Sequence, residues 1–226
     1  QGLGYERAAF EEIAATPEAA GLRHAFLADR RALFPPAAVT ALTPPALGLI
    51  GIRGTGGAAA EVARMALSAG LRVVLTEPDR ATLAATLQRI AAKQEALVAE
   101  GKLSPAARDA DWGRLQSRQD EAGLAEADLI LTTAGSFASI KPQAALGGEG
   151  PLVLHPASQS GGLAEIAVAE GVPPAAQALV LAFARRLGWR TMFAAPGGPV
   201  ERRLRAALSR AVAWLDQSGV SRADIA

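Results

Sequence analysis

The sequence of 226 residues contains no cysteine and only two histidines. The lack of cysteine excludes disulfides, thiolate metal sites and a cysteine nucleophile, and it fits a reducing cytoplasm. Two histidines are too few for a histidine-rich metal centre. No apolar run reaches the roughly 18 residues that a membrane span needs, and the first residues do not resemble a signal peptide. We therefore expect a cytoplasmic protein with no membrane span and no metal site.

An excess of charge of one sign is missing as well. The chain has 23 Lys and Arg against 22 Asp and Glu, interspersed along the sequence, for a formal net charge of +1. This mixture excludes the basic footprint of a nucleic-acid partner. Half of the residues are hydrophobic, enough for one main domain with an appendage. The start at Gln1 without a Met suggests a fragment of something larger.

Glycines at a defined spacing are the most informative feature that is present. Residues 47–52 are a short apolar run, typical of a strand buried on both faces of a parallel sheet. Gly54, Gly56 and Ala59 follow with the spacing G-x-G-x-x-G/A. The first position makes a tight turn, the second lets the backbone approach a pyrophosphate, and the third lets a helix pack on the strand. Arg53 either approaches a phosphate or is solvated.

An acidic residue completes the dinucleotide-binding pattern. Residues 58–69 have the pattern of a helix, and a helix that starts there directs its free N–H groups at the phosphates. Residues 71–76 predict the next strand, and Glu77 follows it, about 20 residues after the turn. A carboxylate at this position accepts hydrogen bonds from the adenosine ribose. The pattern therefore favours NAD over NADP.

The chain divides into three parts. Residues 1–45 are predicted to be a helical linker, broken at Thr16-Pro17, with an extended proline-rich connector. Residues 46–195 are predicted to be a Rossmann NAD-binding domain, and residues 196–226 the start of a C-terminal helical segment. The other predicted strands are 127–132, 152–154 and 191–194, and the other predicted helices are 80–100, a charged stretch to residue 122, 175–187 and about 200–217. This alternation indicates an α/β protein with a doubly wound, mostly parallel sheet.

Several segments resemble the 3-hydroxyacyl-CoA dehydrogenases, in particular the form inside multifunctional fatty-acid β-oxidation proteins. YERAAFEEIAATPEAAGLRHAFLADRRALFP, residues 5–35, resembles the linker between the enoyl-CoA hydratase and dehydrogenase parts. LGLIGIRGTGGAAAEVARMALSAGLRVVLTEPD, residues 47–79, resembles the NAD fingerprint region. GKLSPAARDADWGRLQ with AEADLILTTAGSFASIK resembles the helical excursion and third strand, and RRLGWRTMFAAPGGPVERRL resembles the exit from the Rossmann domain.

The resemblance implies an NAD-dependent oxidoreductase of lipid metabolism. Its reaction would be the oxidation of L-3-hydroxyacyl-CoA to 3-ketoacyl-CoA in fatty-acid β-oxidation. The implied partners are an acyl-CoA substrate and the neighbouring hydratase and dehydrogenase domains of a larger, multifunctional protein. Lys141 falls where the family has a lysine near the cofactor.

The catalytic positions depart from the family pattern, in which a Ser, a His paired to a Glu, and an Asn serve the substrate. Leu152 takes the place of the His, and His155 that of an Asn three residues later. Glu165 corresponds to the partner Glu if one residue is inserted, and Glu201 stands where the last Asn is expected. Nothing between Lys141 and Leu152 matches the Ser segment. The Ser, His and Asn are therefore unmatched.

His155 and Glu165 are the candidate catalytic residues. A hydrogen bond between them would orient the imidazole as a general base for the C3 oxygen. The competing interpretations are an ordinary strand-end role for His155 and a solvated or capping role for Glu165. Two functions follow: an active dehydrogenase, or a catalytically inactive scaffold domain that orients its neighbours.

Overall fold

A single eight-stranded sheet organises the protein in this computed structural model, which describes residues 2–44, 46–133, 142–146, 150–156, 162–194 and 199–220. The strands lie in the order β3-β2-β1-β4-β5-β6-β7-β8. Their bounds are β1 Leu49–Arg53, β2 Arg72–Thr76, β3 Leu115–Arg118, β4 Leu129–Thr132, β5 Gln143–Leu146, β6 Leu152–Pro156, β7 Leu163–Val168 and β8 Arg190–Ala194. Strands β1 to β6 are parallel, β7 is antiparallel to β6, and β8 is parallel to β7. The predicted α/β class with a mostly parallel sheet is confirmed.

The main core lies between one face of the sheet and the helices. Helices α4 (Gly57–Ser68), α5 (Arg80–Ala99) and α7 (Pro174–Arg186) share one cluster of buried apolar side chains with the strands. Ile50 and Ile52 of β1 point into this cluster, whereas Leu49 belongs to a smaller cluster with Leu124 of η1 (Ala122–Glu126). The alternation along β1 shows that both of its faces are covered, which explains its continuous apolar run.

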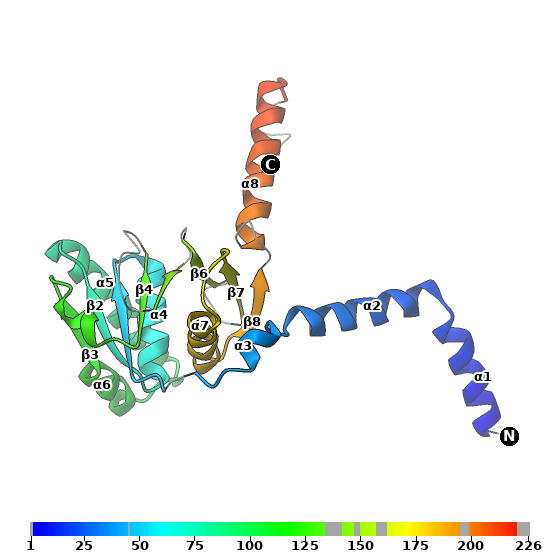
Figure 1. Ribbon diagram of the computed structural model, residues 1–226, viewed down its shortest axis with the longest axis horizontal. Helices are drawn as coiled ribbons and strands as arrows, with labels where there is room; N and C mark the ends of the chain where they lie inside the picture. Colours follow the sequence, from blue (N-terminus) through cyan, green and yellow to red (C-terminus); the bar gives the residue numbers. More distant parts are fainter. Residues whose placement is uncertain are drawn as a thin grey trace.

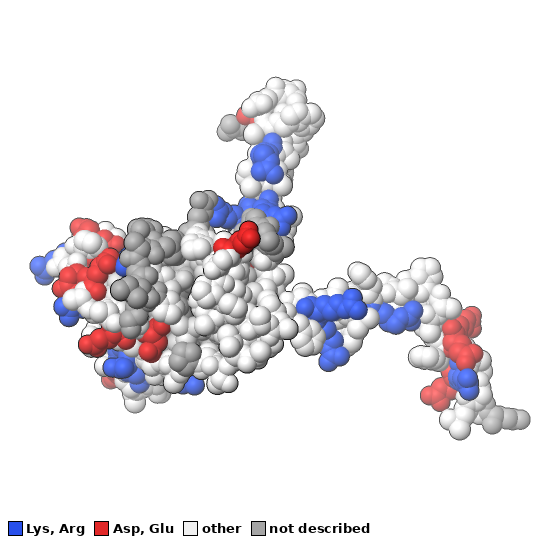
Figure 2. Space-filling model, viewed as in Figure 1, with Lys and Arg blue, Asp and Glu red and all other residues white. Residues whose placement is uncertain are grey.

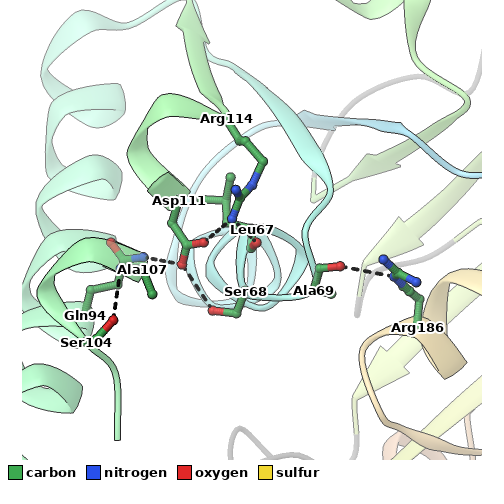
Figure 3. Close-up of polar contacts among 9 residues, drawn as sticks. All are labelled: Leu67, Ser68, Ala69, Gln94, Ser104, Ala107, Asp111, Arg114 and Arg186. Atoms are coloured by element: carbon green, nitrogen blue, oxygen red, sulfur yellow. Dashed lines mark hydrogen bonds and ion pairs between the residues drawn. The ribbon is translucent and has the colours of Figure 1, made fainter. Parts of the chain in front are cut away.

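Helix α6 (Pro105–Gly113) is joined to α4 and α5 by a buried carboxylate (Figure 3). Asp111 is 2% exposed. Its carboxylate accepts hydrogen bonds from Gln94 at 3.0 Å and from Arg114 at 2.5 Å, and a longer one from Ser68 at 3.4 Å. Arg114 also donates to the carbonyl of Leu67 at 3.1 Å, near the end of α4, where carbonyls lack helical partners. The network fixes the end of α4 against the helices that follow it.

Three predictions made from local patterns were wrong. Residues 115–118, expected within a helical stretch, form β3, because the main chain pairs with the edge of β2 although the side chains are mostly exposed. Strands β5 and β7 were not predicted, since neither has a long apolar or alternating run. The proline-rich connector is not wholly extended: α3 (Ala37–Thr40) forms there and buries Val39 against the core shared with α7.

The first two helices extend away from the sheet (Figure 1). Helix α1 spans Gly2–Ala14 and α2 spans Pro17–Ala32, and neither buries a residue. Thr16 caps α2 as predicted, because its side chain accepts the N–H of Ala19 at 3.2 Å. On the visible face, acidic residues gather on α1 and basic residues on α2 (Figure 2). Arg190 of β8 forms an ion pair with Asp29 of α2 at 3.0 Å.

The last described helix, α8 (Val200–Gln217), has the predicted bounds and also buries no residue. It projects from the sheet on the side of β6 to β8 (Figure 1). Its apolar side chains are exposed, among them Leu204, Leu208 and Trp214. The first turn is therefore the part of α8 whose contacts with the sheet position it.

Candidate functional site

The glycine turn after β1 has the backbone that its sequence demands. Gly54 and Gly56 both have φ of 97°, which other residues rarely adopt. The N–H of Gly54 donates to the carbonyl of Thr76 at 2.9 Å, so the turn is bound to the end of β2. A Cβ added to Gly56 or Gly57 would meet no heavy atom within 4 Å. The turn therefore faces open space, as close approach of a pyrophosphate requires.

Helix α4 starts directly at this open space. Gly56 is its N-cap, and no side chain caps its first N–H groups. Those groups and the positive end of the helix dipole can hold phosphate oxygens. Ala59 is 0% exposed and lies in the core cluster beneath α4. A small side chain at this position lets α4 pack closely on the sheet.

Glu77 lies beside the turn, one residue after β2. Its N–H donates to the carbonyl of Arg118 at 3.0 Å, which fixes its backbone between β2 and β3. Its carboxylate accepts the N–H of Asp79 at 3.1 Å and is half-buried. A fixed carboxylate near the glycine turn can bind ribose hydroxyls and repels a 2′-phosphate. The residues present thus fit NAD.

The sequence also suggested Arg53 and Lys141 as residues near the cofactor. Arg53 is committed to an ion pair, with Nη2 at 2.9 Å from Glu121, and its side chain is 18% exposed. Neither of its two expected roles, phosphate contact or solvation, describes this pairing. Lys141 lies outside the described residues, so its role near the cofactor stays a prediction.

The two candidate catalytic residues lie on neighbouring strands. His155 near the end of β6 is directly opposite Glu165 on β7. The expected hydrogen bond between them is replaced by other contacts. Nε2 of His155 pairs with the carboxylate of Glu201, and Nδ1 is buried without a hydrogen-bond partner among the described residues. The imidazole is therefore oriented by α8 and not by β7.

Glu165 has a different task at this point of the structure. It is 3% exposed, and its carboxylate accepts the N–H of Val200 at 2.5 Å and that of Glu201 at 3.2 Å. A negative group at the start of a helix satisfies unpaired N–H groups and the positive end of the dipole. Of the competing interpretations of Glu165, capping is correct and solvation is wrong.

Glu201 is the residue that sequence analysis did not select. Its carboxylate contacts His155 through one oxygen and Arg205 through the other, at 2.6 Å. The hydrogen bond with His155, and next the one with Arg205, lower the pKa of Glu201 below its ordinary value. The available signal was its position at the first turn of a helix, in place of the Asn of the family pattern.

Within the described part of the chain, no group of three or more His, Cys, Asp or Glu side chains could hold a metal ion. In the same part, no helix is both long and apolar enough to cross a membrane.

Known structures show the same fold. The (S)-3-hydroxybutyryl-CoA dehydrogenase of Ralstonia eutropha is 18% identical with a TM-score of 0.65, and the match covers 79% of this chain and 75% of that one. The 3-hydroxybutyryl-CoA dehydrogenase of Escherichia coli is 19% identical with a TM-score of 0.64, over 76% of this chain and 44% of that one. The dehydrogenase part of multifunctional enzyme 1 from C. elegans is 12% identical with a TM-score of 0.57, over 67% and 42%.

Sequence comparison identifies the domain around the glycine turn. No curated relative matches the chain. The family model described as 3-hydroxyacyl-CoA dehydrogenase, NAD binding domain, matches residues 49–143, which run from β1 to the start of β5. The match includes Gly54, Gly56, Ala59 and Glu77, the residues whose geometry fits the cofactor. Residues 49–143 of this chain therefore match the NAD-binding domain of the 3-hydroxyacyl-CoA dehydrogenase family.

Proposed function

We propose that this protein takes part in the NAD-dependent oxidation of L-3-hydroxyacyl-CoA to 3-ketoacyl-CoA. The observation that carries the proposal is the open glycine turn at the start of α4 with the carboxylate of Glu77 beside it. The family match over residues 49–143 supports the choice of reaction. The similar enzymes from Ralstonia eutropha and Escherichia coli are named as 3-hydroxybutyryl-CoA dehydrogenases.

The reaction requires a hydride acceptor and a base in addition to the acyl-CoA. Bound NAD supplies the acceptor for the hydride that leaves C3. The proton of the C3 hydroxyl needs a base, and His155 is our candidate, because histidine is the most frequent general base in enzymes and this one lies near the carboxyl end of β6. The glycine turn follows β1, and β1 runs in the same direction as β6. The glycine turn and His155 therefore both lie at the edge of the sheet where these strands end.

The cellular setting is also a proposal. The resemblance of residues 5–35 to an interdomain linker favours a larger β-oxidation protein with hydratase and further dehydrogenase domains. The exposed apolar side chains of α1 and α2 support contacts with such neighbours. The cysteine-free sequence supports a place in the cytoplasm.

Calorimetric titration with NADH tests the cofactor site directly, with NADPH as the comparison. We expect saturable NADH binding, weaker NADPH binding, and a loss of about tenfold or more in NADH affinity for Glu77→Ala, because hydrogen bonds to a charged group contribute about 1.5–3 kcal/mol. Glu170→Ala is the control, since this carboxylate is exposed in the turn after β7. Equal affinity for both cofactors would contradict the role of Glu77.

Turnover separates an active domain from a scaffold. The chain is mixed with acetoacetyl-CoA and NADH, and the loss of NADH absorbance is followed. Oxidation of NADH above the background supports the proposed reaction. Saturable NADH binding without turnover, in this chain and in the full-length protein alike, would overturn it in favour of the inactive scaffold.

A further inference from the structure

The contacts of the first turn of α8 assign two different tasks to the carboxylates around His155. We infer that Glu201 is the positioning residue that orients His155 as the base of the reaction, and that Glu165 positions Glu201 by holding the first turn of α8. This inference rests on the proposed function, because His155 is its candidate base. It differs from the expectation from sequence, in which Glu165 was the partner of His155 and Glu201 had no assigned role.

The carboxylate of Glu201 contacts the imidazole of His155. One carboxylate oxygen pairs with Nε2 of His155, which comes from a strand 46 residues earlier in the chain. A carboxylate accepts hydrogen bonds and donates none, so the neutral ring carries its proton on Nε2. This leaves Nδ1 as the proton acceptor. A carboxylate behind an imidazole base fixes its orientation and stabilises the imidazolium that forms.

The other ring nitrogen of His155, Nδ1, lacks a visible hydrogen-bond partner among the described residues, and it is buried. A buried polar atom without a partner is unfavourable, and such atoms are rare enough to point to a missing donor. The C3 hydroxyl of the substrate is a donor of the required kind, once substrate binding exposes Nδ1. As the O–H bond breaks, the proton would go to Nδ1, and NAD, when bound, would supply the acceptor for the hydride of C3.

Glu201 is itself held in place by Glu165. Glu165 is 3% exposed and binds the N–H groups of Val200 and Glu201. These bonds attach the main chain of Glu201 to β7, directly opposite His155 on β6. Arg205 holds the second oxygen of Glu201 at 2.6 Å, but its side chain is 80% exposed and this surface pair contributes little. The orientation of His155 therefore depends on both carboxylates, in sequence.

Nitrogen NMR of the full chain tests the arrangement without cofactor or turnover. The chain has two histidines, so the exposed His24 is an internal reference. In alkaline solution, where both rings are neutral, we expect His155 in one tautomer with the proton on Nε2. Glu201→Ala should give a mixture of tautomers at His155 and leave His24 unchanged. A proton on Nδ1 in the unaltered chain would overturn the inference.

Variants of Glu165 distinguish its inferred role, capping of α8, from its expected role as the partner of His155. Glu165→Ala removes the cap of α8 and should also give mixed tautomers. The amide oxygen of Glu165→Gln can still accept the two N–H groups, so this variant should restore the single tautomer. A change caused by Glu165→Gln but not by Glu201→Ala would show that Glu165 is the partner of His155 after all. Because Gln keeps the side chain's size, it also guards against a variant that merely misfolds.

Turnover adds the functional readout. Glu201→Ala should lower kcat by about tenfold or more, because general base catalysis contributes about 10²–10⁴-fold and depends on orientation. NADH affinity should stay within about threefold of the unaltered value. Glu165→Gln should recover most of the kcat that Glu165→Ala loses. The expected tautomers without any turnover would reject the proposed function and the role of His155 as its base, while unchanged kcat in Glu201→Ala would reject the inference alone.

Discussion

At the scale of single residues, burial decides how much a carboxylate contributes to the stability of the fold. Asp111 and Asp109 lie two residues apart on α6, and each pairs with an arginine. Asp111 is 2% exposed and also binds Gln94, whereas the side chain of Asp109 is 67% exposed. The buried residue links α6 to α4 through Ser68 and to α5 through Gln94 (Figure 3). The exposed residue contacts its sequence neighbour Arg108 only at the surface of the protein.

The stability of two alanine variants checks this difference. Asp111→Ala should lower the free energy of unfolding by about 3 kcal/mol, because it leaves the buried amide of Gln94 without its acceptor and breaks the ion pair of the buried carboxylate with Arg114. Asp109→Ala should change it by less than about 1 kcal/mol, as for other exposed ion pairs. Urea unfolding followed by fluorescence measures both. Equal losses in the two variants would contradict the structural role of Asp111.

Gly56 gives a prediction that separates binding from stability. Its φ of 97° disfavours any side chain, and a Cβ there would occupy the space open to the pyrophosphate. Gly56→Ala should therefore abolish measurable NADH binding and cost about 1–3 kcal/mol of stability through backbone strain. Gly101→Ala is the matched control, since Gly101 has φ of 70° after α5, far along the chain from the turn. This control should lose stability and keep its NADH affinity.

At the scale of secondary structure elements, predictions succeeded where a segment carries its own signal. The apolar run of β1, the capped start of α2 and the amphipathic α8 were all located from sequence. Strand β3 was missed because an exposed edge strand is defined by its partner and not by its side chains. Strand β7 contains Glu165, and a charged residue argues against burial unless its hydrogen bonds are known.

The attachment of α8 leads to a prediction about acidity. His155 and, less strongly, Arg205 lower the pKa of Glu201. In His155→Ala the largest cause is absent, so the pKa of Glu201 should rise toward 4.5, its ordinary value. Carbon NMR of the glutamate carboxyl groups measures the pKa of Glu201 in the unaltered chain and in His155→Ala. Arg205→Ala is the comparison and should give a smaller rise.

The same shift has a consequence for stability. The pKa of Glu201 is lower in the folded protein than in the unfolded chain, so the contribution of the pair is present above the ordinary value of 4.5 and is lost as the pH falls through the lowered value. The difference in unfolding free energy between the unaltered chain and Glu201→Gln should shrink as the pH falls below 4.5. A constant difference down to pH 3 would contradict the pairing.

At the scale of the whole molecule, the sequence indicated the fold and the cofactor but not the arrangement at the candidate site. Gly54, Gly56 and Glu77 could be proposed as cofactor-binding residues because one strand-turn-helix unit and the next strand place them together. His155, Glu165 and Glu201 meet through strand register and the direction of α8, neither of which appears in a spacing. A contact across 46 residues depends on tertiary structure alone.

The described part of the chain is also not one packed body. Helices α1, α2 and α8 bury no residue and extend away from the sheet (Figure 1). Strands β1, β2 and β4, by contrast, lie in the core. NAD bound at the glycine turn should therefore stabilise only the sheet domain. At a concentration of about 100 times Kd, the ligand adds about 2.7 kcal/mol, so amide exchange in the core strands should slow about 100-fold. Exchange in α1 and α2 should not change, and Gly56→Ala should abolish the effect. Equal protection of α1 and α2 would mean that they unfold together with the sheet, which their lack of buried side chains argues against.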